Sequence, residues 1–433
     1  MRLFAREAEW IFRRVPRCRC AGFGMVKLNH SIVRDFLSLI TNRGLDSLIS
    51  IVIVPYLLSK IGNVEYGKII VAQSIACIGV AIINYGTDLL MLQKVPEYVR
   101  FRKGAGISIL VSRIFWLRSV LFILFGVVVF LILTVFVEDA AIRLYTEVFL
   151  ILCLAEVFSV SHVLVAFHDV KILPRISVVR FLFLLLFTFL LVKGSSDSIR
   201  YVCLLVISYF LSNLYILGYV FRKYHLHCYP TNSFVAIQNV FVQSSPFFTS
   251  RLNLLLSDKL YNLLSATFIS LSTAALLDIS FKILSVLVIP VQILNSIILG
   301  HVSVRSSPSQ MRRIFGGVFV FSVSLFLVLV LLQKYVLLYY SFPLTTEICL
   351  ALSIILFSSV FANLSIFIGE NVMVSYSLGS SLVKSSIYAS LFVFPLLIGV
   401  LNMKQSIIVI ALFFLLHKIC EFALRLFYSW KYL

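Results

Sequence analysis

Charged residues are scarce in this sequence. Only 13% of its 433 residues are Asp, Glu, Lys or Arg, whereas 61% are hydrophobic, and the mean hydropathy is +1.05. In a typical soluble domain about a quarter of the residues are charged, so this composition excludes a soluble domain. About a dozen apolar runs of roughly 20 residues follow one another, and a helix of that length crosses the hydrocarbon core of a membrane. The composition therefore predicts an all-α polytopic membrane protein.

The sequence also lacks the motifs of nucleotide-binding proteins and of common catalytic sites. The chain has no GxxxxGK[ST] phosphate loop, no HExxH and no GxSxG. Cys18 and Cys20 form a CxC pair, but no second Cys or His pair lies at the spacing of zinc ligands. No loop between predicted spans exceeds about twenty residues, which leaves no room for a large catalytic loop. We therefore expect no enzyme activity, no metal, no cofactor and no use of ATP by this chain.

Basic residues are concentrated in alternate loops. The formal net charge is +19, which would suit nucleic-acid binding if it covered one surface. Cytoplasmic loops of membrane proteins carry an excess of Lys and Arg, and the alternation here follows that rule. It predicts that both termini are cytoplasmic and that the number of spans is even. The main clusters are Arg13, Arg14, Arg17 and Arg19; Arg100, Arg102 and Lys103; Arg222 and Lys223; and Arg312 and Arg313.

Twelve spans are expected, in two lobes of six around a central cavity. The polar, basic segment 222–233 separates the lobes, which are residues 25–225 and 226–433. Residues 1–24 form a basic extension, either a cytoplasmic arm or an artefact of the assigned start. Transporters are often built from such structural repeats. The predicted spans are 36–59, 67–92, 113–137, 145–168, 177–193, 200–221, 236–265, 272–299, 312–334, 347–369, 382–402 and 405–428.

Several predicted spans contain charged residues. Even on a lenient scale, a charge facing lipid at the bilayer centre costs roughly 2.5–3.5 kcal/mol. Residues three, four or seven apart lie on the same face of a helix, where opposite charges can pair. Such pairs either fix helix packing or line a hydrated interior. Four pairs have this spacing: Arg43 with Asp46, Arg251 with Asp258, Asp278 with Lys282, and Lys418 with Glu421.

Further charges lie singly or near span ends. Asp88 is close to the end of the second span, where it either reaches the interface or faces inward, and Glu156 lies among apolar residues of the fourth. Lys259 follows Asp258 and points to another face. Lys418 and Glu421 are three apart in the last span. Because so many charges cannot all face lipid, we expect a polar cavity that is mixed in sign but rich in cations.

Two stretches carry a family resemblance. Residues 42–90 contain Pro55-Tyr56, Gly62 followed by Tyr66-Gly67, and Tyr85-Gly86, and a second stretch runs from Ser250-Arg251 through Asp258-Lys259 to Pro290 and Gln292. Together with length and short loops, these motifs resemble the Wzx polysaccharide repeat-unit (O-antigen) flippases of the multidrug/oligosaccharidyl-lipid/polysaccharide exporter superfamily. The segment between spans seven and eight, ISLSTAALL, lacks the Gly-Tyr-Tyr-like motif often found there.

The resemblance implies a flippase of the bacterial inner membrane. Its substrate would be an undecaprenyl-pyrophosphate-linked oligosaccharide, moved by alternating access from the cytoplasmic to the periplasmic face. Arg43, Arg251, Lys259 and Lys282 would bind the pyrophosphate. The candidates for ion coupling or for acidic cavity positions are Asp46, Asp88, Glu156, Asp258 and Asp278. The expected partners are the bilayer and the cognate polymerase and chain-length regulator, and a monomer is expected.

Two other functions are considered. A multidrug exporter of the same superfamily would favour an acidic, aromatic cavity, and the excess of cations argues against it. A membrane glycan polymerase or acyltransferase would need an external catalytic loop or a buried His with a partner. His162 and His417 lie in predicted spans without such a setting in the sequence.

Overall fold

The computed structural model describes residues 30–100, 104–167, 169–229, 234–301, 308–373 and 378–430. Within these ranges the chain is helical and contains no strand. Apolar runs become helices in a membrane because lipid offers no hydrogen-bond partner, so each backbone group must be satisfied within its own segment. The elements are α2 (His30–Asn84), α3 (Thr87–Arg100), α4 (Gly104–Phe136), α5 (Ala140–Val157), α6 (Ser161–Ala166), α7 (Ile172–Leu191), η1 (Ser195–Asp197), α8 (Ser198–Tyr224), α9 (Phe234–Phe268), α10 (Leu271–His301), α11 (Pro308–Tyr339), α12 (Thr346–Phe367), the π-helix η2 (Ile368–Met373), α13 (Gly379–Met403) and α14 (Ile407–Ser429).

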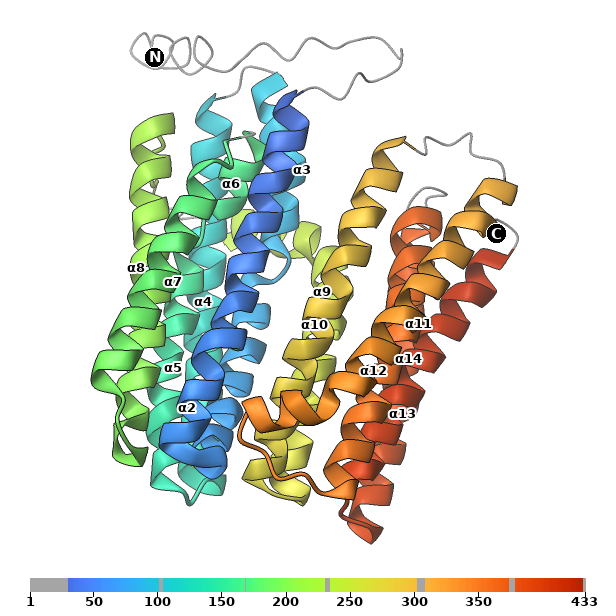
Figure 1. Cartoon of the computed structure of the whole chain (residues 1–433). Coiled ribbons are helices and arrows are strands. Elements are labelled where there is room, and N and C mark those ends of the chain that lie inside the picture. The colour runs from blue at the N-terminus through green and yellow to red at the C-terminus, as the bar shows by residue number, and fades with distance from the viewer. Residues whose placement is uncertain are drawn as a thin grey trace, which may run out of the picture. The chain divides into compact units, whose positions relative to one another are not determined.

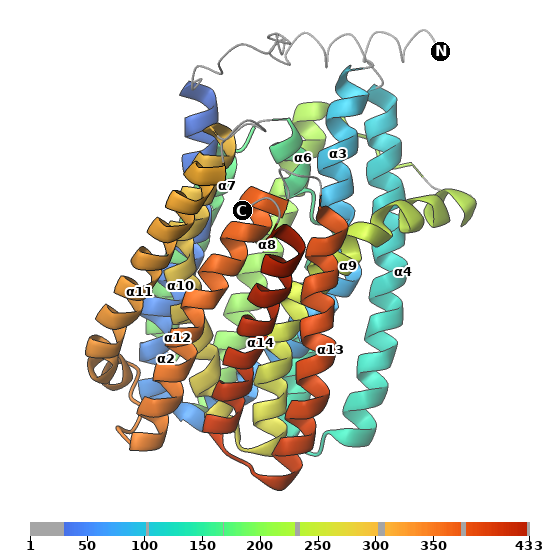
Figure 2. The ribbon, with the colours of Figure 1, turned by 90° about the vertical axis from the view of Figure 1, so that its right-hand side faces the viewer.

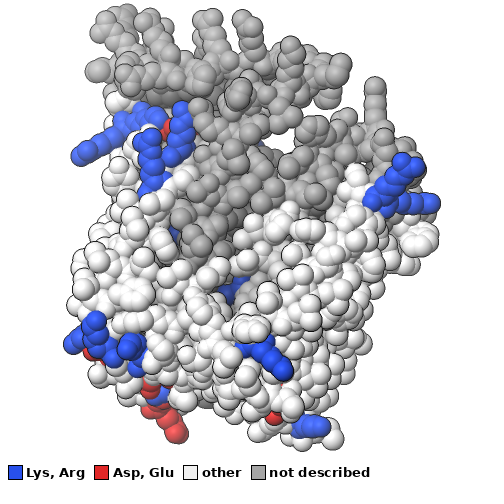
Figure 3. All heavy atoms as spheres, in the orientation of Figure 1, with Lys and Arg blue, Asp and Glu red and all other residues white. Residues whose placement is uncertain are grey.

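Ten segments of the described chain are long and apolar enough to cross a membrane. Their outer faces carry large apolar side chains: Ile123 and Phe136 of α4 are 61% and 77% exposed, and Leu331 of α11 is 78% exposed. On the face shown in Figure 3, most of the described side chains are uncharged, and the Lys and Arg side chains form small separate groups. Such an uncharged surface suits contact with lipid. The predicted all-α polytopic membrane protein is confirmed.

The first two predicted spans share α2. The helix is interrupted at Gly62, whose φ of 83° and ψ of 164° are not helical. A left-handed φ is easily adopted only by glycine, so Gly62 provides the reversal between the two spans. The second predicted span also continues into α3. The predicted span 145–168 runs over α5 and α6, 347–369 ends in η2, and each of the others falls on one helix, the seventh on α9.

The chain divides into two compact units. Unit 1 contains 1–46, 75–192 and 199–252, and unit 2 contains 47–74, 193–198 and 253–433. Both α2 and α9 contribute residues to each unit. The lobes expected from the sequence, 25–225 and 226–433, stay a prediction.

Unit 1 has an apolar core between α3, α4, α6 and α8 (Figure 1). Near this core, α2 ends at a tight break, where Tyr85 and Gly86 have φ values of 45° and 69°. The ring of Tyr85 stacks between those of Phe241 and Phe248, with both centroid distances at 4.3 Å. The break therefore anchors the first part of α9 to the end of α2.

Unit 2 is built around α12, which packs against α10, α11 and α14, while α13 packs against α14 (Figure 2). Its apolar core includes Val291, Val318, Phe367 and Val372. Two of its helices begin with side-chain caps, because Thr345 accepts a hydrogen bond from the Ile348 amide and Ser406 from the Ile408 amide. Such caps satisfy amides that have no partner in the first turn.

Replacing Gly86 by Ala should destabilise unit 1. A Cβ there would lie 2.6 Å from the Phe248 nitrogen and 2.7 Å from the Phe247 Cβ, and the φ of 69° is itself unfavourable for Ala. We expect a loss of about 2 kcal/mol, seen as a lower melting temperature of the purified protein in detergent. The control is Gly126→Ala on α4, where nothing lies within 4 Å of the new Cβ. Equal melting temperatures for the two variants would contradict the steric argument.

Candidate functional site

A polar cluster in unit 2 joins three helices around Asp278, and we call it the Asp278 cluster. One turn along α10, the Lys282 Nζ lies 2.6 Å from the Asp278 Oδ2. From α2, the Tyr66 hydroxyl donates to the same carboxylate at 3.1 Å and accepts a 2.6 Å hydrogen bond from Lys282. From α9, the Lys259 Nζ lies 4.0 Å from the Asp278 Oδ1. The predicted pair of Asp278 and Lys282 is therefore present, and Lys259 joins it.

The Asp278 cluster carries more positive than negative charge. Two ammonium groups share one carboxylate, so the cluster has a net charge of +1 when all three groups are ionised. The Asp278 side chain is only 4% exposed, whereas those of Lys259 and Lys282 are 25% and 27% exposed. The carboxylate is therefore enclosed, while both lysine side chains are partly exposed. This arrangement leaves positive charge available for an anionic ligand.

A second polar cluster lies in unit 1 around Arg118 of α4, and we call it the Arg118 cluster. The guanidinium is fully buried and donates to the Thr87 hydroxyl at 2.9 Å. It also donates to the backbone oxygens of Glu156 and Ser159 at 3.0 and 2.7 Å. The Glu156 Oε1 lies 3.8 Å from Arg118 and accepts a 2.6 Å hydrogen bond from Asn84. Arg118 thus neutralises Glu156 and holds the carbonyls at the break between α5 and α6.

Asp88 lies beside a histidine in unit 1. Its side chain is buried in the first turn of α3, and its Oδ2 lies 3.3 Å from the Nε2 of His162 on α6. A carboxylate in the first turn also interacts favourably with the helix dipole. Asp88 therefore faces inward, which was one of the two interpretations of the sequence.

The last helix holds a third buried cluster, in unit 2. Glu421 pairs with Arg425 one turn along α14, and both are hydrogen-bonded to Ser386 of α13. Arg425 also donates to the Ser365 backbone oxygen at 2.9 Å. The spacing predicts that Lys418 pairs with Glu421. In the structure the Lys418 Nζ lies instead 4.0 Å from the Oδ1 of Asp258 on α9.

Of the nine predicted site residues, the structure brings together Lys259, Lys282 and Asp278. Asp88, Glu156 and Asp258 each have their own partner. The side chains of Arg43, Asp46 and Arg251 lie outside the described residues, although all three positions are helical. Sequence reasoning missed Arg118, which lies only five positions from the start of the predicted span 113–137, whereas α4 begins at Gly104. An arginine fourteen positions inside an otherwise apolar helix is the signal that could have found it.

Comparison with known proteins identifies the family. A family model described as "Polysaccharide biosynthesis protein" matches residues 32–301, which is more than half of the chain. The chain belongs to this family. The predicted resemblance to polysaccharide exporters is thereby confirmed. No curated protein matches the sequence of this polysaccharide biosynthesis protein.

Solved structures of transporters have the same fold. The MATE multidrug transporter DinF-BH in complex with R6G has a TM-score of 0.67, with 12% identity over 94% of this chain and 96% of its own. An inward-facing MATE transporter of the MOP superfamily has a TM-score of 0.61, with 12% identity over 89% and 97% of the two chains. An outward-facing MATE transporter of the MOP superfamily has a TM-score of 0.56, with 10% identity over 93% of this chain and 95% of its own. At such identities, the likeness concerns the fold.

The described residues contain no group of three or more His, Cys, Asp or Glu side chains that could hold a metal ion. Their polar clusters combine opposite charges with hydroxyl and amide groups, as in the Asp278 cluster. This set of donors suits the binding of an anion rather than coordination of a metal.

Replacing Asp278 by Asn should destabilise the protein, because it leaves two ammonium groups without their shared carboxylate. We expect a loss of about 3 kcal/mol, at the lower end for a broken buried pair because both lysines are partly exposed. Melting in detergent measures it, with the exposed Glu138→Gln as control. A stability equal to that of the control would show that Asp278 does not hold the lysines.

Proposed function

We propose that this polysaccharide biosynthesis protein is a flippase for an undecaprenyl-pyrophosphate-linked oligosaccharide, such as an O-antigen repeat unit. The observation that carries the proposal is the Asp278 cluster, in which two accessible lysines share one enclosed carboxylate. Family membership and the transporter fold support a role of this cluster in transport.

A pyrophosphate requires cationic groups in a site that excludes bulk water. Charge-assisted hydrogen bonds from Lys to phosphate oxygens are about twice as strong as neutral ones. Lys259 and Lys282 supply such donors, and Tyr66 positions Lys282 through its hydroxyl. The proposal adds Arg43 and Arg251 from the sequence, because guanidinium groups bind phosphate in a bidentate manner.

The glycan and the lipid tail make different demands. Each hydroxyl that loses water without a new partner costs a few kcal/mol, so the glycan must cross through a polar interior. The lipid tail can stay in the bilayer. With a potential that is negative inside, moving an anion outward is favourable by roughly 2.3 kcal/mol per charge per 100 mV. Transport to the periplasmic face is therefore downhill without coupling to an ion.

The proposal includes location and partners. Both termini are cytoplasmic, since the basic loops alternate with poorly charged ones, and the membrane is the bacterial inner membrane. The product would be passed to a polymerase and its chain-length regulator. A monomer suffices, because one chain supplies both units.

Removing the lysines should impair flipping. Lys259→Ala and Lys282→Ala each delete one charged donor, so we expect the transport rate to fall about tenfold for each. The rate would be measured as the sidedness of the lipid-linked repeat unit in a deletion strain complemented with each variant. Lys404→Ala is the control, because Lys404 is an exposed lysine between α13 and α14.

The same assay separates the other functions. Repeat units trapped on the cytoplasmic face in the deletion strain support the flippase. Repeat units that face the periplasm but stay unpolymerised would indicate a polymerase instead. Unchanged surface glycan combined with increased drug sensitivity would indicate a multidrug exporter.

Ion coupling is tested separately. If the membrane potential drives transport, collapsing the proton and sodium gradients while the potential is held should leave the flipping rate unchanged. If flipping stopped instead, acidic residues would be the carriers of the coupled ion. The pairs to replace would then be Asp88 beside His162 and Glu156 beside Arg118. Asp46, Asp258 and Asp278 complete the acids considered for this role.

A further inference from the structure

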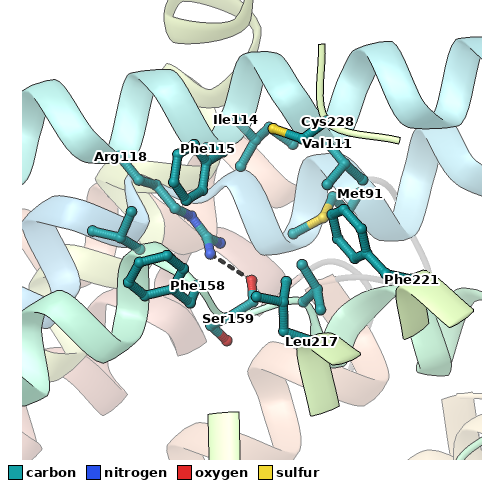
Figure 4. Close-up of a pocket in the computed structure, with 12 residues that line it drawn as sticks. Met91, Val111, Ile114, Phe115, Arg118, Phe158, Ser159, Leu217, Phe221 and Cys228 are labelled. Carbon is teal, nitrogen blue, oxygen red and sulfur yellow. Dashed lines mark hydrogen bonds between the residues drawn. The ribbon is translucent and has the colours of Figure 1, made fainter. Parts of the chain in front are cut away.

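Unit 1 contains a cavity of about 220 Å³ that the transport proposal does not use. It lies between α3, α4, the link from α5 to α6, and α8 (Figure 4). Its lining is apolar except for Arg118, Ser159 and Cys228. On α4, Val111, Ile114 and Arg118 are three to seven positions apart, so they follow one face of the helix over about 10 Å.

Arg118 lines one end of the cavity, and its guanidinium is buried there. Figure 4 shows the Arg118 guanidinium among the apolar side chains, with Phe158 and Leu217 on one side and Ile114 and Phe115 on the other. Its Nε and Nη1 are used by Thr87, Glu156 and Ser159. Its Nη2 is buried and has no hydrogen-bond partner among the described residues. Such an unpaired buried donor is destabilising, and a ligand oxygen would satisfy it.

The other end of the cavity reaches the surface at Cys228. This residue is exposed, and it also lines the cavity. The segment around it is held against α4, because the Tyr229 amide donates to Ser112 at 2.9 Å and the His227 amide to Ser108 at 3.3 Å. Cys228 is therefore fixed at the mouth rather than carried by a free loop.

We propose that this cavity binds an aliphatic alcohol, with the hydroxyl oxygen at Arg118 Nη2 and the chain directed toward Cys228. The apolar lining selects a hydrocarbon chain. A neutral oxygen is preferred to a carboxylate because Glu156 already lies 3.8 Å from the guanidinium and balances its charge. A second anion would meet Glu156 as a like charge in a low dielectric.

The size of the cavity sets the length of the chain. A water molecule occupies about 30 Å³ in the liquid, so 220 Å³ corresponds to roughly seven groups of that size. Hexan-1-ol has about that number of non-hydrogen atoms and is the probe. Water is the competing occupant, but it needs two to four polar partners, and this lining offers few.

The experiment measures alkylation of Cys228 in the full chain in detergent. A soluble maleimide modifies the thiol, and peptide mass spectrometry reports the rate at Cys228 alone. Hexan-1-ol at ten times its dissociation constant should slow the reaction about tenfold by mass action. Hexan-1-ol should bind about tenfold more tightly than 1-chlorohexane, which has no comparable acceptor, and more tightly than hexanoate.

Two variants show where the alcohol binds. Leu217→Trp fills the cavity and keeps Arg118, so it should abolish protection while Cys228 still reacts at its basal rate. Leu214→Trp is the matched control, because Leu214 lies one turn away on α8 and is 36% exposed outside the cavity. Arg118→Gln should remove the preference for hexan-1-ol over 1-chlorohexane if that variant folds.

Three results would overturn the proposal. The first is no protection of a reactive Cys228 by hexan-1-ol, which would leave only water in the cavity. The second is equal protection in Leu217→Trp, which would place the effect elsewhere. The third is stronger binding of hexanoate or 1-chlorohexane, which would contradict recognition of a neutral oxygen by Arg118.

Discussion

The cost of charge in a low-dielectric interior governs the polar interior of this protein. Arg118 in unit 1 and Arg425 in unit 2 are both buried, and each lies near a carboxylate. Each also donates to backbone oxygens where a helix is interrupted: Arg118 at the break after α5, and Arg425 at Ser365 just before η2. Breaks change the backbone hydrogen-bond pattern, and side-chain donors then stabilise the carbonyls where no water is present. The two arginines therefore make irregular backbone possible inside apolar helices.

The Asp278 cluster follows a different rule. Its carboxylate is enclosed and lies near two lysines, whose side chains are partly exposed. Structural ion pairs such as Glu421 with Arg425 are buried on both sides, and their charges balance one to one. A partly exposed excess of positive charge is costly unless an anion or water compensates it. This contrast distinguishes the proposed substrate site from a packing element within the same unit.

Helix breaks and aromatic packing position these clusters. Gly62 reverses α2, and Tyr66 follows it by one turn and reaches Asp278 and Lys282. The stacking of Tyr85 between Phe241 and Phe248 fixes the end of α2. Asn84 and Thr87 flank that end and contact Glu156 and Arg118. Local backbone conformation at glycines thus decides which polar side chains meet across helices far apart in sequence.

The sequence by itself determined the helical spans and one pair within a helix, because hydrophobic length and helical spacing are local properties. It predicted Asp278 with Lys282 for this reason. Only the tertiary structure decided the partners across helices. Lys259 and Tyr66 join Asp278, Lys418 approaches Asp258 rather than Glu421, and Arg118 occupies a cavity wall. These contacts depend on how each helix is rotated and where it begins, which packing against neighbouring helices sets.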